Sequence, residues 1–266
     1  MNNPGGTVET FAKIEPPAYI LEGFRGVLRF WVLARAFHHL GDYEKELATV
    51  NRALEYHPRA MNHLGEKVRA LAALGRIQEI NLVIDESLTL PVGYTSPSDV
   101  MCAAAKELRV QGRFEMAREF ASRAVDWCNK QPDPAAHRGD LADALRLAER
   151  WADAQVVFAE LAAENADKVA YLGKLGTLAV RLGDEGRARE IFNSLRQMDP
   201  LFLEGEHTYW CACISALLGE RDLAVAMLKE SWDQGMPFPD IKWRDMDLEP
   251  LGDSPHFQEM IKPKGL

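Results

Sequence analysis

The chain has 266 residues, of which 47% are hydrophobic and 27% are charged, and its formal net charge is −9. These fractions are typical of a soluble folded protein, and the acidic balance disfavours a nucleic-acid-binding domain, which usually carries a basic stripe. Four cysteines in a chain of this length form no disulfide framework, and the sequence has no secretory-signal pattern and no run of eighteen apolar residues. We therefore expect a cytoplasmic protein that binds neither nucleic acid nor membrane.

The first 26 residues show no helical period. They contain the pair Pro16-Pro17 and several aromatic residues, and a proline inside a helix removes a hydrogen bond and clashes with the preceding turn. We expect residues 1–26 to form an irregular N-terminal arm that lies against the structure after it.

A recurring turn organises residues 27–235. Its glycine returns every 34 to 37 residues, and one copy has a glutamate in its place; the equivalent positions are Gly41, Gly75, Gly112, Glu149, Gly183 and Gly219. A fixed period of this length is typical of stacked structural repeats. The alternative is an unrelated bundle of helices, which would not need six copies in register.

Each turn stands between two helical patterns. In the first copy, one apolar face precedes the turn and another follows it; the residues are Phe30, Leu33, Ala34 and Phe37, then Tyr43, Leu47, Val50 and Ala53. Pro58 then ends the second helix. The pattern predicts an αα-hairpin, repeated about six times.

Residues 236–266 no longer follow the repeat. A loop rich in proline follows Gly235, and Ser254 followed by Pro255 has the form of an N-cap and a first helical residue. We expect a C-terminal loop and a short capping helix that ends near Ile261 and covers the last repeat, because a hairpin at the end of a stack cannot bury its apolar face alone.

The repeated pattern resembles the tetratricopeptide repeat (TPR) family, over roughly Val27 to Trp232. The shared features are the glycine turn, small residues at the helix crossings and a closing proline; the departures include Lys67, Glu149 and Ser231. The resemblance implies an all-α fold, a right-handed superhelix of about six degenerate hairpins. The tail from Leu248 to Phe257 is also similar to the end of repeat arrays in bacterial signalling proteins.

In the TPR family the first helices of successive hairpins line a concave groove. Transferred to this sequence, the resemblance implies partner-binding residues at Trp31, Arg35, His39, Arg69, Lys106, Arg109, Arg146, Lys174, Tyr209 and Trp210, with Thr177, Arg181 and Cys213 at further groove positions. The groove positions are more basic than the chain as a whole. Arg35, Arg69 and Lys106 occupy one position in three consecutive repeats, which favours a ladder of cations for an acidic peptide. The alternative is that these charges pair with neighbouring acids.

Three glycines recur at another groove position, namely Gly65, Gly139 and Gly173. Glycine within a helix costs on the order of 1 kcal/mol relative to alanine, so the recurrence needs a reason. Either the missing side chain lets a ligand approach, or it relieves crowding between adjacent hairpins. The lysine and asparagine that clamp a chaperone carboxylate in some TPR arrays are absent, because the sequence has Leu28 and Val32 there.

Motifs for catalysis or metal binding are weak. Cys211 and Cys213 lie two residues apart on a predicted helix and so point to different sides. We predict no metal, no cofactor and no enzymatic activity, and we expect the histidines at 38, 39, 57 and 63 to be surface or groove residues. The predicted function is a scaffold that binds a protein or peptide. The alternatives are a sensory or regulatory module of a bacterial signalling or transcription-regulating protein, which acts through an effector domain, and a solenoid groove that is capped into a small-molecule or enzymatic pocket.

Overall fold

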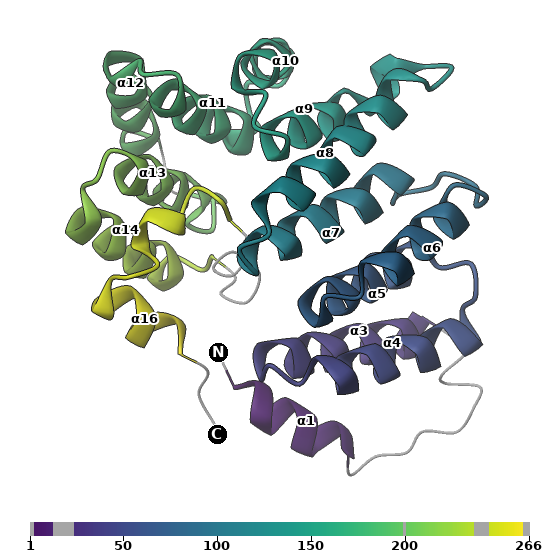
Figure 1. The fold of residues 1–266 in the computed structure, drawn as a ribbon. Helices are drawn as coiled ribbons and strands as arrows, with labels where there is room; N and C mark the ends of the chain where they lie inside the picture. Colours follow the sequence, from purple (N-terminus) through teal and green to yellow (C-terminus); the bar gives the residue numbers. More distant parts are fainter. Residues whose placement is uncertain (1–2, 13–23, 199–200, 237–244, 263–266) are drawn as a thin grey trace. The chain divides into compact units, whose positions relative to one another are not determined.

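The computed structural model describes residues 3–12, 24–198, 201–236 and 245–262, and every regular element in these ranges is a helix (Figure 1). No strand occurs in them. The predicted all-α class and its helical hairpins are therefore confirmed. The handedness of a superhelix and the boundaries at residues 27, 235 and 236 stay predictions.

The chain divides into two compact units. The first unit runs to Trp127 and the second runs from Cys128 to Lys262. The helices that begin in the first unit are α1 (Pro4–Ala12), α3 (Phe24–His39), α4 (Tyr43–Tyr56), α5 (Met61–Leu74), α6 (Ile77–Ser87), α7 (Pro97–Val110) and α8 (Phe114–Asn129).

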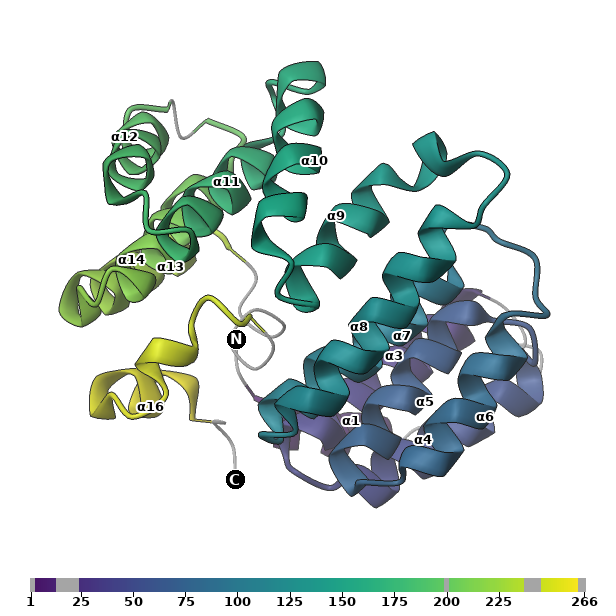
Figure 2. The ribbon, with the colours of Figure 1, turned by 45° about the horizontal axis from the view of Figure 1, so that its top comes forward.

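Helices of the first unit follow one another as antiparallel hairpins (Figure 2). Helix α3 packs on α4 and α5 packs on α6, while α5 also packs on both α4 and α7. The first helices of successive hairpins therefore lie next to each other, and each hairpin covers the apolar face that its neighbour leaves open. The buried side chains that join them are small or branched, such as Ala34, Leu64 and Ala104.

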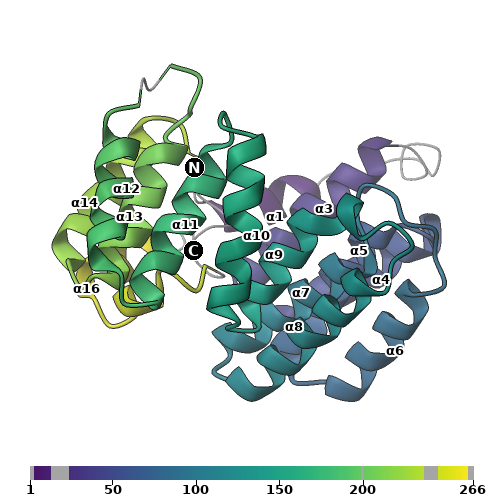
Figure 3. The same cartoon turned by 90° about the horizontal axis from the view of Figure 1, so that it is seen from above.

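The second unit repeats this arrangement. It contains the short helix η1 (Pro134–His137), α9 (Arg138–Leu147), α10 (Trp151–Glu164), α11 (Val169–Arg181), α12 (Glu185–Arg196), α13 (Glu206–Leu217), α14 (Arg221–Asp233), η2 (Glu249–Leu251) and α16 (Pro255–Ile261). Figure 3 shows α11 to α14 as neighbouring helices. Helix α11 packs on α10, α12 and α13, so the first helices are again adjacent.

In all six recurring turns, the residue at the equivalent position has a left-handed backbone conformation. The glycines have φ between 73° and 82°, and Glu149 has φ 60°. In each turn, the residue after this position donates its N–H to a carbonyl five residues back, as Asp42 does to Phe37 O at 3.0 Å and Arg150 does to Leu145 O at 2.9 Å. The turn is thus a backbone motif that glutamate can also adopt, at an energetic cost.

The C-terminal helix begins as predicted. The Ser254 hydroxyl accepts the Phe257 N–H at 3.4 Å, and Pro255 lies in the first turn of α16. Phe257 and Ile261 are buried in the same apolar cluster as Leu228 of α14. Helix α16 therefore covers the last hairpin.

The start of the chain differs from the expected irregular arm. Residues Pro4–Ala12 form helix α1, and the Asn3 side chain accepts the Gly6 N–H at 2.8 Å, which caps it. The sequence pattern did not indicate this helix, because Gly5 and Gly6 in its first turn have a low helix propensity. Arg29 of α3 donates to Phe11 O at 2.8 Å and lies over the Phe11 ring, so α1 packs on α3. Pro16 and Pro17 lie outside the described residues.

Candidate functional site

Helices α3, α4, α5 and α7 of the first unit carry a buried cluster of charges. Arg69 of α5 is 1% exposed. Its Nε and Nη2 atoms both lie 2.6 Å from Glu46 Oε1 on α4, and its guanidinium also pairs with Glu66. Arg69 is thus neutralised inside the unit, and the predicted ladder of Arg35, Arg69 and Lys106 does not present three free cations.

A histidine extends this cluster to the third hairpin. His38 Nδ1 lies 2.7 Å from Glu46 Oε2, and His38 Nε2 lies 3.3 Å from Glu107 Oε2 on α7. Glu46 and Glu107 are both fully buried. His38 and His63 are also buried, which corrects the expectation that these histidines are surface or groove residues. Contacts among His38, Glu46, Arg69 and Glu107 thus join α3, α4, α5 and α7.

Other predicted residues of the first unit remain partly open to solvent. Trp31, Arg35, His39, Lys106 and Arg109 are half-buried. The Arg35 guanidinium lies 4.2 Å from the centre of the Trp31 ring and 3.9 Å from Glu66, and Arg109 stacks on the ring of Phe114. Lys106 makes no ion pair with any residue in the described part of the chain. We call the half-buried predicted side chains on α3 and α7, together with the exposed Asn62 of α5, the unit 1 face; its members are Trp31, Arg35, His39, Asn62, Lys106 and Arg109.

Burial weakens the basicity of one of these groups. The pKa of Arg35 falls to about 10, because burial disfavours the charged guanidinium more than the charge of Glu66 favours it. Arg35 still carries its charge at neutral pH. It can therefore take part in binding a carboxylate.

In the second unit, cations at the predicted groove positions hold a segment of the same chain. Arg146 Nη1 of α9 lies 3.1 Å from Asp247 Oδ2, and Arg181 of α11 donates to Asp247 Oδ1 from Nε at 3.1 Å and from Nη2 at 2.8 Å. Asp247 is fully buried. Burial acts to raise the pKa of Asp247, but the charges of Arg146 and Arg181 outweigh it and hold that pKa below its ordinary value.

Asp245, two residues before Asp247, contacts α13, which is the first helix of the last hairpin. The Tyr209 hydroxyl of α13 donates to Asp245 Oδ2, and Arg146 Nη2 lies 3.6 Å from Asp245 Oδ1. Burial, followed by the charge of Asp245, raises the pKa of Tyr209 well above its ordinary value, so the phenol keeps its proton. The side chains on α9, α11 and α13 that meet Asp245–Asp247 form what we call the unit 2 face; they are Arg146, Thr177, Arg181, Tyr209 and Cys213.

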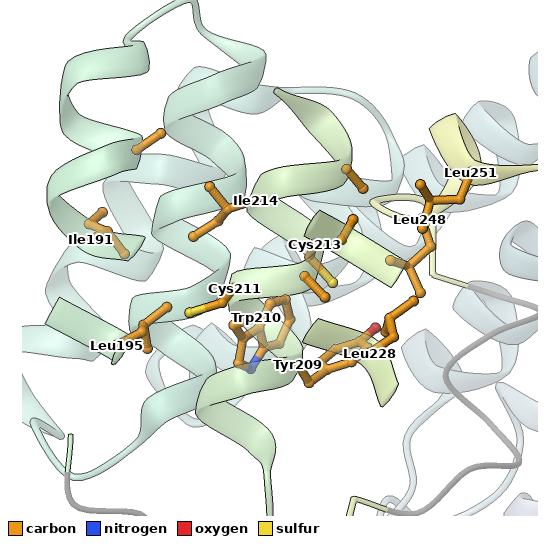
Figure 4. Packing of buried hydrophobic residues seen from close by; sticks show 14 of the residues in the cluster. Ile191, Leu195, Tyr209, Trp210, Cys211, Cys213, Ile214, Leu228, Leu248 and Leu251 are labelled. Carbon is orange, nitrogen blue, oxygen red and sulfur yellow. The ribbon is translucent and has the colours of Figure 1, made fainter. Parts of the chain in front are cut away.

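The two aromatic residues of α13 that were predicted to bind a partner, Tyr209 and Trp210, lie in the core of the second unit (Figure 4). Tyr209 is 3% exposed and Trp210 is 6% exposed. The Trp210 ring lies against Gly173, where an added Cβ would come within 2.6 Å of Trp210 Cβ. Lys174 is also engaged, with its Nζ 2.6 Å from Asp143 Oδ1. Tyr209, Trp210 and Lys174 thus contact other residues of the second unit in this structure.

The recurring glycines have different surroundings. Gly173 relieves crowding against the next hairpin, as one of the two explanations requires. At Gly65 and Gly139, however, nothing lies within 4 Å of the position that a Cβ would take. Gly65 therefore leaves open space on α5, between Trp31 on α3 and Lys106 on α7 in hairpin order.

The cysteines of α13 point apart, as predicted for residues two apart on a helix. Figure 4 shows the Cys211 sulfur directed toward Leu195, and Cys211 Sγ lies 3.7 Å from Phe192 O. Burial raises the pKa of Cys211 to about 12. Within the described ranges, no group of three or more His, Cys, Asp or Glu side chains could hold a metal ion, and no helix there is long and apolar enough to cross a membrane.

Four acidic residues were missed by the sequence analysis. Glu46 and Glu107 lie on the buried sides of α4 and α7, and Asp245 and Asp247 lie beyond the last hairpin. An acid inside an otherwise apolar helical face is the signal that could have found Glu46, which lies three residues after Tyr43 and four residues before Val50. Such an acid needs a buried partner.

No family model matches the sequence, and no curated protein matches it. Among solved structures, the chain is similar to a tetratricopeptide repeat protein from Parabacteroides merdae ATCC 43184, with 14% identity and a TM-score of 0.45 over 94% of this chain and 93% of that one. It is also similar to an IFIT1 N216A monomeric mutant with m7Gppp-AAAA, with 16% identity and a TM-score of 0.40 over 87% of this chain and 55% of that one.

Proposed function

We propose that this chain is a scaffold of helical hairpins that binds an acidic segment of another protein on the unit 1 face. The face has the parts that such binding needs. Arg35, Lys106 and Arg109 supply cations, Trp31 supplies an aromatic surface, and Gly65 leaves space for a backbone. Aromatic and arginine side chains are the residues that most often dominate the energy of an interface.

One observation carries the proposal. The equivalent first-helix positions in the second unit already hold an acidic segment, because Arg146 and Arg181 bind Asp247. First helices of this chain are therefore suited to bind carboxylates. The unit 1 face also presents cations from first helices, namely Arg35 on α3 and Lys106 and Arg109 on α7. The proposal assigns no catalytic step to the chain.

Charge reversal tests the unit 1 face. Peptides would be selected from a random displayed library against the full chain, and their affinity measured for the wild type and for Lys106→Glu with Arg109→Glu. We expect an acidic consensus and at least a tenfold loss of affinity in the double variant, which corresponds to about 1.4 kcal/mol. Binding should also weaken with added salt.

The matched control is Arg59→Glu with Lys130→Glu. Both residues are exposed, they lie in or next to loops, and the pair changes the net charge by the same amount. This control should leave affinity unchanged. Equal losses in the two double variants would mean that only net charge matters, and unchanged affinity in both would remove the unit 1 face as the binding site.

A further inference from the structure

The C-terminal segment crosses three successive first helices of the second unit. Asp247 meets Arg146 on α9 and Arg181 on α11, and Asp245 meets Tyr209 on α13. Arg181 Nη2 also donates to the Met246 carbonyl at 2.9 Å, so the backbone of the segment is held as well as its side chains. The unit 2 face therefore binds this segment as a receptor binds a peptide.

The two carboxylates are placed by the segment itself. The Asp247 N–H donates to Asp245 Oδ1 at 2.9 Å, and the Leu248 N–H donates to Asp245 O at 3.0 Å. This turn brings acids two residues apart onto one side, where both can reach Arg146. The recognised feature is thus a pair of acids on a turn.

Apolar side chains anchor the same segment. Met246 and Leu248 are each 2% exposed and Leu251 is fully buried, and Leu248 and Leu251 belong to the cluster that contains Tyr209 and Cys213 (Figure 4). The complete pattern is Asp245-Met246-Asp247-Leu248 followed by Leu251. A ligand of the unit 2 face has to supply two acids and these apolar anchors in that order.

Arg146 and Arg181 can pair with acids from the same chain or from another chain. A buried ion pair gives little net stability, because the cost of removing both charges from water offsets their attraction, but leaving Arg146 and Arg181 without acids is costly. Another segment with the same acids and anchors would satisfy them equally. The segment of the same chain has the advantage of a high effective concentration, since it is covalently attached.

We propose that the unit 2 face is a receptor for an Asp-apolar-Asp-Leu segment of a partner protein, and that residues 245–262 are its intramolecular occupant and compete with that partner. This inference rests on the proposed function, since both treat the first helices as a site for acidic segments. It adds a second site, the unit 2 face, and the sequence pattern of its ligand. It also adds the role of residues 245–262, which occupy that site and exclude the ligand.

The test is exchange of the segment in the full chain after a single cut. A specific protease site is inserted within residues 237–244, so that residues 245–266 stay bound only by their contacts after cleavage. The probe is a fluorescent synthetic peptide of residues 245–262. We expect it to bind the cleaved protein at least a hundredfold more tightly than the uncut protein, and to bind at least tenfold more weakly when it carries Asp245→Asn and Asp247→Asn.

Circular dichroism is followed on the cleaved protein during the exchange. Exchange with full helical signal supports the proposal. The proposal is overturned if the original fragment never leaves, or if it leaves only when the helical signal is lost, since either result makes residues 245–262 a permanent part of the fold. A dimer of the uncut protein held by exchanged C-terminal segments would also overturn it, because the occupant would then be a second copy of this chain.

The outcome is independent of the test of the unit 1 face. Lys106 and Arg109 belong to the first unit, whereas residues 245–262 and the side chains of the unit 2 face belong to the second. Peptide exchange can therefore fail while binding to the unit 1 face persists, or succeed when that binding is absent.

Discussion

At the scale of single residues, burial decides how this protein responds to acid. His63 is 1% exposed and its Nε2 atom has no hydrogen-bond partner among the described residues. Burial, with a smaller effect from His57, lowers the pKa of His63 below its ordinary value. The same direction applies to His207 in the second unit, because of burial and the charge of Arg196. Both rings are neutral in the folded protein at neutral pH.

Acid should therefore destabilise the protein before its carboxylates titrate. Between the lowered pKa of His63 and about 6.5, the unfolded chain binds more protons than the folded one, so the free energy of unfolding falls as pH falls. The slope is at most about 1.4 kcal/mol per pH unit for one group. Urea denaturation at pH 7.5 and 5.5 should show a smaller loss for His63→Gln than for the wild type.

The exposed His256 supplies the control for this prediction. His256→Gln should lose as much stability on acidification as the wild type does. If His63→Gln and His256→Gln behave alike, then the burial of His63 does not contribute to the pH dependence.

At the scale of elements, the turn between two helices of a hairpin is fixed by one left-handed residue. A residue with a Cβ adopts this conformation at a cost of roughly 1–2 kcal/mol. Gly183 has φ 82° with no atom within 4 Å of an added Cβ, so Gly183→Ala should lower stability by about 1 kcal/mol through the backbone alone. Glu149, with φ 60°, carries this cost already.

Glu149→Gly should therefore raise the urea midpoint of the second unit. Glu149→Ala is the matched control, since it removes the same carboxylate but keeps the Cβ, and it should give no gain. Equal effects of the two substitutions would show that the carboxylate, and not the backbone, determines the result.

A glycine inside a helix, Gly173, makes room for a contact between two successive hairpins. An alanine at position 173 would overlap Trp210 of the next first helix, so Gly173→Ala should cost about 1–3 kcal/mol by overpacking. Gly139→Ala meets open space and should gain up to about 1 kcal/mol from helix propensity. Thermal denaturation of the two variants gives the comparison, and a gain in both would mean that Trp210 moves aside freely.

At the scale of the whole molecule, the structure favours the second of the two interpretations of the groove charges, in which cations pair with acids of the same chain. Counting only the groove positions of the first helices indicated an excess of cations for a partner. The structure pairs many of these cations with acids from elsewhere in the chain, such as Arg69 with Glu46 on a second helix and Arg146 with Asp247 beyond the last hairpin. The role of an attached effector domain stays a prediction.

The sequence by itself determined the hairpins, their turns and the start of the last helix. These features are local: the turn at Gly41 needs one left-handed residue, and the cap of α16 needs Ser254 three residues before Phe257. A helix period and a turn signal are complete within a few residues, so they can be read without the fold.

Only the tertiary structure decided which charges are buried and what lies on the unit 2 face. Glu46 and Arg69 are 23 residues apart, and Arg146 and Asp247 are 101 residues apart. No periodic pattern relates such residues, because their meeting depends on how stacked helices bring distant segments together. The free energy of a buried charge depends on that partner, and so the sequence marked the cations of the first helices but could not show which acids neutralise them.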